Sequence, residues 1–124
     1  MDQELYEAAV KARENAYCPY SHFAVGAAVR TKDGHIFTGC NIENASYGLT
    51  VCAERNAIFS AVQAGYREFL ALLVTANTPD PVSPCGACRQ VMAEFKISKI
   101  VVTNLHGVCR ETTIEALLPD GFTL

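Results

Sequence analysis

No stretch of this sequence approaches the roughly 20 consecutive apolar residues that a membrane-spanning helix requires. The first residues, Met1 to Glu4, are acidic and lack the basic and apolar segments of a secretory signal peptide. Internal repeats, low-complexity segments and linkers are also missing. These absences argue against a membrane-embedded or secreted protein, so we expect a cytoplasmic one.

An excess of positive charge is missing as well. The chain has 10 lysines and arginines against 13 aspartates and glutamates, a formal net charge of -3. A protein that binds a nucleic acid polymer normally carries a basic stripe along one face. We therefore expect neither a nucleic acid polymer nor a membrane as partner, and a small uncharged substrate fits this charge balance better.

The 124 residues, half of them hydrophobic, suit one domain over residues 1–124 with a core that needs no disulfide bonds. Disulfides are in any case rare in a reducing compartment, where clustered cysteines more often bind metal or take part in catalysis. The chain has six cysteines: Cys18, Cys40, Cys52, Cys85, Cys88 and Cys109.

Hydrophobic periodicity predicts alternating helices and strands. The expected helices cover residues 2–16, 51–64 and 84–95, and a short helix opens at the Thr112–Glu115 capping pattern. The expected strands are 24–31 and 36–40, joined by an Asp-Gly hairpin turn, then 70–75, 100–103 and a short 108–110. A hairpin followed by strand–helix alternation predicts an α/β fold, a mixed sheet with helices on both faces.

Residues with capping chemistry flank these helices. Asp2, Thr50 and Ser83 precede the first three, and Pro84 would occupy the first turn of the third. Gly65 follows the second helix, as is typical of a helix C-terminus.

Two short segments carry most of the chemistry, Cys52-Ala53-Glu54 and Pro84–Cys88. Cys85 and Cys88 are three residues apart, so they share a helical face and can bind one ion. With Cys52 they supply three ligands and leave one tetrahedral position open, which is typical of a catalytic zinc site with a bound water. Both segments fall at predicted helix N-termini, where thiolates are stabilised.

Glu54 lies two positions after a predicted ligand and must therefore be near the metal, which sits beyond the helix end. There it can accept the proton of the water and return protons to the substrate as a general acid. Arg55 can hydrogen-bond a ligand sulfur and offset the surplus negative charge of three thiolates on a divalent cation.

The same residue types also have structural or redox interpretations. Cys85 and Cys88 alone could form a redox pair or half of a structural zinc site. The other three cysteines and the three histidines are interpreted as structural or surface residues. Arg89 and Gln90 open the third helix and are left outside the site.

Four segments resemble the small homotetrameric cytidine deaminases. They are Tyr20–Ala28, Gly39–Tyr47, Cys52–Arg55 and Ser83–Gln90, and the resemblance runs over nearly the whole chain. It implies a three-layer α/β/α fold with a central mixed sheet and one Zn2+ per subunit. It also implies hydrolytic deamination of cytidine and 2'-deoxycytidine in pyrimidine salvage, in which zinc-bound hydroxide attacks C4 and Glu54 moves the protons.

The resemblance also implies roles for substrate-binding residues. Phe23 would pack against the pyrimidine, Asn41 and Glu43 would bind a sugar hydroxyl, and Ala53 with Glu54 would read the base edge. In a homotetramer, neighbouring subunits would complete each pocket with Ala45, Tyr47 and Phe122.

Other functions stay open at this point. A blasticidin-type deaminase shares the cysteine segments, and a polynucleotide-editing deaminase shares the chemistry. From other classes, a non-catalytic zinc or interaction module would close the metal site with a fourth protein ligand. A redox protein would use Cys85 and Cys88 for thiol–disulfide exchange.

Overall fold

A computed structural model describes all 124 residues and confirms the α/β fold. A five-stranded mixed sheet forms the centre, with strand order β2-β1-β3-β4-β5. The strands are β1 (Val25–Thr31), β2 (Ile36–Cys40), β3 (Phe69–Ala76), β4 (Lys99–Thr103) and β5 (Cys109–Thr113). The helices are α1 (Gln3–Arg13), α2 (Ala53–Gln63), α3 (Gly86–Glu94) and α4 (Ile114–Leu117), and a 3-10 turn, η1, covers Tyr47–Leu49.

The sheet combines antiparallel and parallel pairs. β1 pairs antiparallel with both β2 and β3, β3 pairs parallel with β4, and β4 pairs antiparallel with β5. Gly34 has a φ of 98°, a conformation that its lack of a Cβ permits, and so allows the tight β1–β2 turn. Parallel strands need a crossover, and α3 supplies it between β3 and β4.

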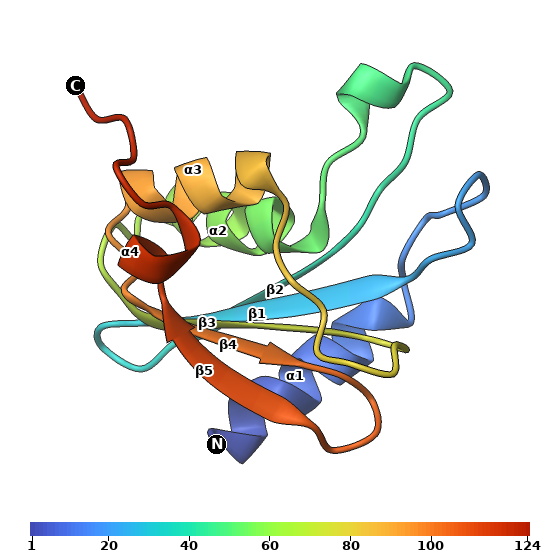
Figure 1. Ribbon diagram of the computed structural model, residues 1–124, viewed down its shortest axis with the longest axis horizontal. Coiled ribbons are helices and arrows are strands. Elements are labelled where there is room, and N and C mark those ends of the chain that lie inside the picture. The colour runs from blue at the N-terminus through green and yellow to red at the C-terminus, as the bar shows by residue number, and fades with distance from the viewer.

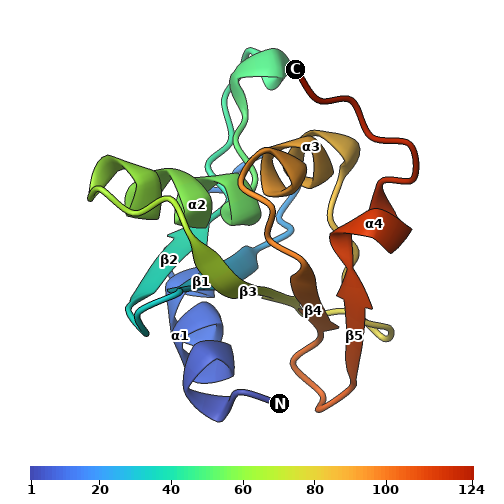
Figure 2. The same cartoon turned by 90° about the vertical axis from the view of Figure 1, so that its left-hand side faces the viewer.

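The helices form layers above and below the sheet (Figure 1). In Figure 2, α2 and α3 cover one face and α1 covers the other. The side chains of β3 alternate between the two sides because successive residues of a strand point in opposite directions. Leu72 and Val74 belong to the core beneath α2 and α3, whereas Ala71 and Leu73 pack with α1. This arrangement confirms the predicted three-layer architecture.

Two of the predicted helix caps are wrong. The N-cap residues of α2 and α3 are Cys52 and Cys85, not Thr50 and Ser83, and neither cysteine makes a side-chain cap hydrogen bond. Pro84 accordingly lies before the helix. The hydroxyl of Thr50 instead accepts from the Asn44 amide at 3.1 Å. The sulfurs of Cys52 and Cys85 therefore take no part in capping their helices.

The other helix ends agree more closely with the sequence. Asp2 caps α1 through a hydrogen bond from Leu5 N, and Gly65 follows α2 with a φ of 103°. The short α4 is capped by Thr113, one residue after the predicted Thr112. None of the helices combines the length and the apolar character that a membrane span requires.

The segment between β2 and α2 extends away from the rest of the molecule and carries η1 near its tip (Figure 1). At its base, Ile42 forms isolated bridges with Tyr17 and with Val51. This base places Asn41 and Glu43 beside the start of α2.

Candidate active site

The N-termini of α2 and α3 bring three cysteine sulfurs together. Those of Cys52, Cys85 and Cys88 all lie within 4.8 Å of one another, and Cys52 and Cys85 are 3.7 Å apart. Zinc–sulfur bonds of about 2.3 Å at tetrahedral angles place two sulfurs about 3.8 Å apart. The three cysteines therefore fit a tetrahedral zinc ion and leave its fourth position without a protein ligand.

The electrostatics of these sulfurs also favour a cation. A hydrogen bond with Cys88 lowers the pKa of Cys52 to about 5, and the same contact, together with burial, raises the pKa of Cys88. Two sulfurs this close cannot both be thiolates unless a positive charge stabilises them. A divalent metal ion supplies that charge, and all three residues can then bind it as thiolates.

Arg55 supplies part of the balancing charge. Its Nη2 donates to the Cys52 sulfur at 3.5 Å. Burial lowers the pKa of Arg55, but its hydrogen bonds to Cys52 and Cys88 outweigh this effect and raise the pKa overall. The Nε atom is buried without a hydrogen-bond partner, so the guanidinium is held against the sulfurs at some cost in solvation.

Glu54 is a buried acid beside the same cysteines, with 4% of its surface exposed. Burial raises the pKa of Glu54 to about 7, and the negative charge of Cys52 adds to this effect. A carboxyl group with a pKa near neutrality can both accept and donate a proton, as general acid–base catalysis requires.

A cavity of about 240 Å³ joins the cysteines to the β2–α2 segment. Seven of the residues predicted from the sequence line it: Phe23, Asn41, Glu43, Cys52, Ala53, Glu54 and Cys85. Cys88 is fully buried behind it. The fold thus assembles most of the predicted residues around one space.

Asn41 connects this cavity to the start of β1. Its Oδ1 accepts from Val25 N at 2.9 Å, and its Nδ2 donates to the Phe23 carbonyl at 2.8 Å. Because the amide uses one acceptor and one donor site in this way, it keeps one of each for another molecule. Asn41 therefore fixes the backbone of Phe23 as well as lining the cavity.

Glu43 is held by the loop that precedes β1. Its Oε1 accepts from the backbone amides of Tyr20 at 3.0 Å and Ser21 at 3.1 Å, and its Oε2 accepts from the Ser21 hydroxyl. The hydrogen bond from the Ser21 hydroxyl is the largest cause of a lowered Glu43 pKa, and the two amides add to it. Glu43 is therefore kept as an anion.

Besides Cys88 and Arg55, which lie at the cysteine cluster without lining the cavity, three predicted site residues are outside it. Ala45 is exposed in the extended segment, and Tyr47 and Phe122 are 76% and 67% exposed. Tyr47 packs edge-on against Tyr20 beside a separate shallow hollow. In one chain, these residues contribute nothing to the space next to Glu54.

The cavity also contains residues that sequence reasoning left out: Ser21, Val25, Thr50, Val82 and Ser83. Ser21 and Ser83 stand inside the motifs that carried the resemblance, and a hydroxyl next to a candidate binding residue was the available signal. Val25 and Val82 gave no such signal, since they are ordinary apolar residues.

The family comparison agrees with this geometry. The sequence profile described as "Cytidine and deoxycytidylate deaminase zinc-binding region" matches residues 1–104. The chain belongs to the cytidine deaminase family. Its membership confirms the predicted enzyme class and zinc as the cofactor, and the three cysteines provide the site for that metal.

Individual cytidine deaminases resemble the chain over nearly its full length. Those of Halalkalibacterium halodurans and Sporosarcina psychrophila are 54% and 55% identical, over 98% of this chain and 93% and 90% of theirs. The crystal structure of cytidine deaminase from Burkholderia pseudomallei superposes with a TM-score of 0.95 at 56% identity, covering 98% of this chain and 99% of that one. A blasticidin-S deaminase from Bacillus cereus is 35% identical over 98% of the chain.

This cytidine deaminase family member ties its third helix to its C-terminal segment through two residues outside the cavity. The Arg89 guanidinium donates to the carbonyls of Pro84 and Leu117, both at 2.8 Å, and Gln90 donates to the Phe122 carbonyl at 2.9 Å. Arg89 thereby holds the backbone next to Cys85, so leaving both residues outside the cavity is consistent with the structure.

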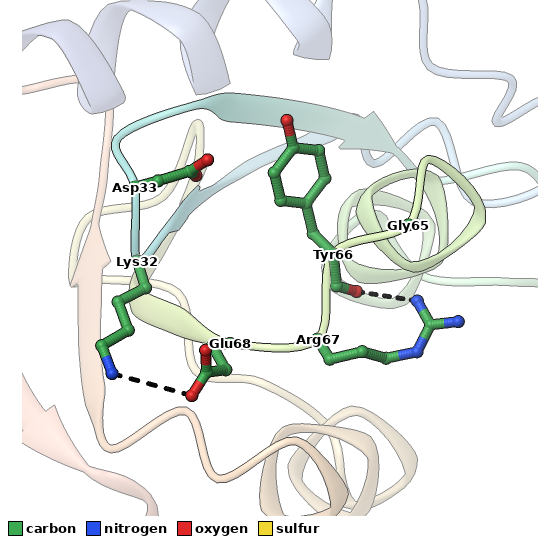
Figure 3. A pocket seen from close by; sticks show the side chains of 6 residues that line it. All are labelled: Lys32, Asp33, Gly65, Tyr66, Arg67 and Glu68. Carbon is green, nitrogen blue, oxygen red and sulfur yellow. Dashed lines mark hydrogen bonds and ion pairs between the residues drawn. The ribbon is translucent and has the colours of Figure 1, made fainter.

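A larger hollow of about 380 Å³ lies at the other end of α2 (Figure 3). Its charged groups are already engaged: Lys32 lies 3.7 Å from Glu68, and Arg67 donates to the carbonyls of Val62 and Tyr66. No nucleophile or metal-binding cluster faces it, and we assign the function to the cysteine-lined cavity.

Proposed function

We propose that the protein catalyses the hydrolytic deamination of cytidine and 2'-deoxycytidine to uridine and 2'-deoxyuridine. Water adds to C4 of the pyrimidine, the bond from C4 to the amino nitrogen breaks, and ammonia leaves. The observation that carries this proposal is the buried Glu54 in the cavity that Cys52 and Cys85 also line, next to the three clustered sulfurs.

Glu54 moves the protons in this reaction. Its carboxylate accepts a proton from the attacking water, and the resulting acid delivers protons to the ring nitrogen and to the leaving amine. Burial keeps bulk water away from this group, so protons pass between Glu54 and the substrate rather than to the solvent.

Zinc held by Cys52, Cys85 and Cys88 supplies a Lewis acid that activates the water. The Arg55 guanidinium draws negative charge from the Cys52 sulfur through its hydrogen bond. The charge of three thiolates weakens zinc as a Lewis acid, and this contact offsets part of that charge.

The rest of the cavity holds the nucleoside. Phe23 packs against the pyrimidine ring, and the Ala53 carbonyl with Glu54 accepts hydrogen bonds from the base edge. Asn41 and Glu43 bind a sugar hydroxyl, for which the free sites on both side chains are suited.

We also propose that the chain is a single domain and works as a homotetramer whose subunits share pockets. Support comes from the large apolar side chains that are exposed along the loops, among them Tyr17, Ile42, Tyr47, Leu49 and Phe122. Such a collection of exposed apolar groups is typical of an interface. Ala45, Tyr47 and Phe122 would then reach a neighbouring subunit's cavity. A role in pyrimidine salvage in the cytoplasm completes the proposal.

A spectrophotometric assay on cytidine and 2'-deoxycytidine tests the reaction. The purified protein should turn over both nucleosides, and extraction of zinc with a chelator should abolish turnover. Glu54→Gln should keep one zinc per subunit and lose nearly all activity, because the amide cannot take up the proton of the water.

Two cysteine variants test whether the metal site is the one proposed. Cys88→Ser should lose zinc and activity, whereas Cys109→Ser, on exposed β5, should keep both. Faster turnover of blasticidin S than of cytidine would favour the blasticidin-type alternative. Full activity of Glu54→Gln would contradict the mechanism.

A further inference from the structure

We propose that Ser21 is a positioning residue for sugar recognition: its hydroxyl aims one oxygen of Glu43 at a hydroxyl of the nucleoside's ribose. This inference rests on the proposed function, in which Glu43 contacts the sugar. It concerns a residue that makes no contact with the reacting base.

Three of the hydrogen-bond sites on Glu43 are occupied within the protein. A carboxylate offers about four lone-pair sites, two on each oxygen. Both sites on Oε1 are taken by the amides of Tyr20 and Ser21, and one site on Oε2 is taken by the Ser21 hydroxyl. One acceptor site remains, and it is on Oε2.

The neighbours of the Ser21 hydroxyl fix the direction of its proton. Its oxygen accepts from the backbone amide of Phe23 at 3.0 Å, and Glu43 is an anion that can only accept. The single hydroxyl proton must therefore point to Glu43 Oε2. The result is a chain of hydrogen bonds from the Phe23 amide through Ser21 to Glu43.

The loop that presents Ser21 is held in an unusual conformation. His22 has a φ of 56°, in the left-handed region that non-glycine residues seldom adopt, and its amide donates to the Cys18 carbonyl at 2.9 Å. This geometry turns the amides of Tyr20 and Ser21 toward Glu43 while directing Phe23 into the cavity. One short loop thus fixes the base-packing side chain and the sugar-binding side chain relative to each other.

Ser21 and Glu43 line the active-site cavity together with Phe23 and Asn41, and they also border the hollow beside Tyr47. A sugar hydroxyl that donates to the remaining Oε2 site completes the hydrogen bonding of the carboxylate. Without the Ser21 hydroxyl, Oε2 has two free sites, and only the two amide hydrogen bonds at Oε1 restrain the carboxylate. Binding of the sugar would then have to order the Glu43 carboxylate, which the native loop already holds in place.

The test compares cytidine with 2',3'-dideoxycytidine, which lacks the 2' and 3' hydroxyls of the ribose and keeps only the 5' hydroxyl, in wild type and in Ser21→Ala. Ser21→Ala should raise KM for cytidine about tenfold with kcat nearly unchanged, since it weakens binding to ground and transition state alike. For the dideoxynucleoside, KM should change by less than about twofold, because the 2' and 3' hydroxyls that could donate to Glu43 are missing.

Two further variants separate positioning from a general structural effect. Ser21→Thr keeps the hydroxyl and should restore the cytidine KM to within about threefold of wild type. In a Glu43→Gln background, Ser21→Ala should add little, because the two residues act on the same hydrogen bond. Ser60→Ala, at an exposed serine of α2, is the matched control and should leave both substrates unaffected.

Equal losses on cytidine and on the dideoxynucleoside would overturn the role of Ser21, because the effect would then act through Phe23 or the loop as a whole. Additive effects of the Ser21 and Glu43 changes would overturn it too. If the wild-type protein turns over neither nucleoside, the proposed function fails and this inference fails with it.

Discussion

Gly39 of β2 lies directly against the Ala53 carbonyl in the first turn of α2. A Cβ on Gly39 would come within 2.5 Å of that oxygen, and within contact distance of the Ala57 amide. Ala53 follows Cys52 and precedes Glu54, so this glycine sets how closely the catalytic end of α2 approaches the sheet.

Gly39→Ala should therefore disturb the metal site through the fold. Because backbone atoms on both sides cannot yield easily, we expect the free energy of unfolding to fall by about 1–3 kcal/mol. Zinc content per subunit should fall with it. Gly48→Ala is the control, since a Cβ there meets no atom within 4 Å, and a similar loss in that variant would refute the steric explanation.

Arg55→Ala should separate metal binding from catalysis. The three sulfurs remain, so zinc should stay bound, but the charge that Arg55 brings to Cys52 is lost. We expect turnover of cytidine to fall about 10- to 100-fold, the usual effect of removing a group that supports a metal ligand. Zinc analysis and steady-state kinetics on one preparation check this, and unchanged turnover would contradict it.

Two buried threonines should respond oppositely to replacement by valine. Thr75 on β3 is fully buried, and its hydroxyl has no hydrogen-bond partner. Thr103 on β4 is equally buried, but its hydroxyl donates to the Val74 carbonyl at 2.9 Å. Since valine has nearly the same shape, Thr75→Val should stabilise the protein and Thr103→Val should destabilise it, each by about 1 kcal/mol. Chemical denaturation measures both, and a loss of stability in Thr75→Val would show that its hydroxyl has a partner.

Asp2 should make stability depend on pH. Its carboxylate caps α1 and accepts from Arg30 Nε at 2.8 Å, and this hydrogen bond lowers its pKa. The Asp2 carboxyl group thus loses its proton more readily in the folded protein than in the unfolded chain, where aspartates titrate at about pH 3.9. The stabilisation is complete above that pH and is lost as the pH falls through the lower pKa of the folded state.

Asp2→Asn keeps the cap and removes the titration, so it is the matched comparison. Wild type should be more stable than Asp2→Asn near neutral pH, and the difference should shrink as the pH falls below about 4. Zinc loss in acid affects both proteins and cancels in the difference. A constant difference across this range would show that the Arg30 contact does not favour the ionised form.

The proposed sharing of pockets predicts recovery of activity in mixed oligomers. Glu54→Gln subunits carry an intact Phe122, and Phe122→Ala subunits carry an intact Glu54. If Phe122 serves a neighbour, random equal mixing yields wild-type surroundings in about a quarter of all pockets. Co-expressed variants should then exceed the mean activity of the two separate variants. No gain over that mean would place Phe122 in its own subunit's pocket or outside any pocket.

Local features of the sequence were enough to predict much of the fold and of the site. The alternation of strands and helices, the hairpin at Asp33-Gly34 and the caps at Asp2 and Gly65 depend on nearest neighbours, and the structure has them. The identity of the three sulfur ligands also followed from residue chemistry and spacing. The caps of α2 and α3 could not be predicted correctly, because threonine and serine are better capping residues than cysteine when nothing else binds the sulfurs.

The sequence by itself determined which chemical groups this protein has and the period with which they recur along the chain. Only the tertiary structure decided that sulfurs 33 positions apart lie 3.7 Å from each other, that Glu54 is buried, and that the Ser21 hydroxyl donates to Glu43. Strand order and the packing of two helix N-termini on the sheet fix these distances. They depend on contacts across the whole core, which no local stretch of residues specifies.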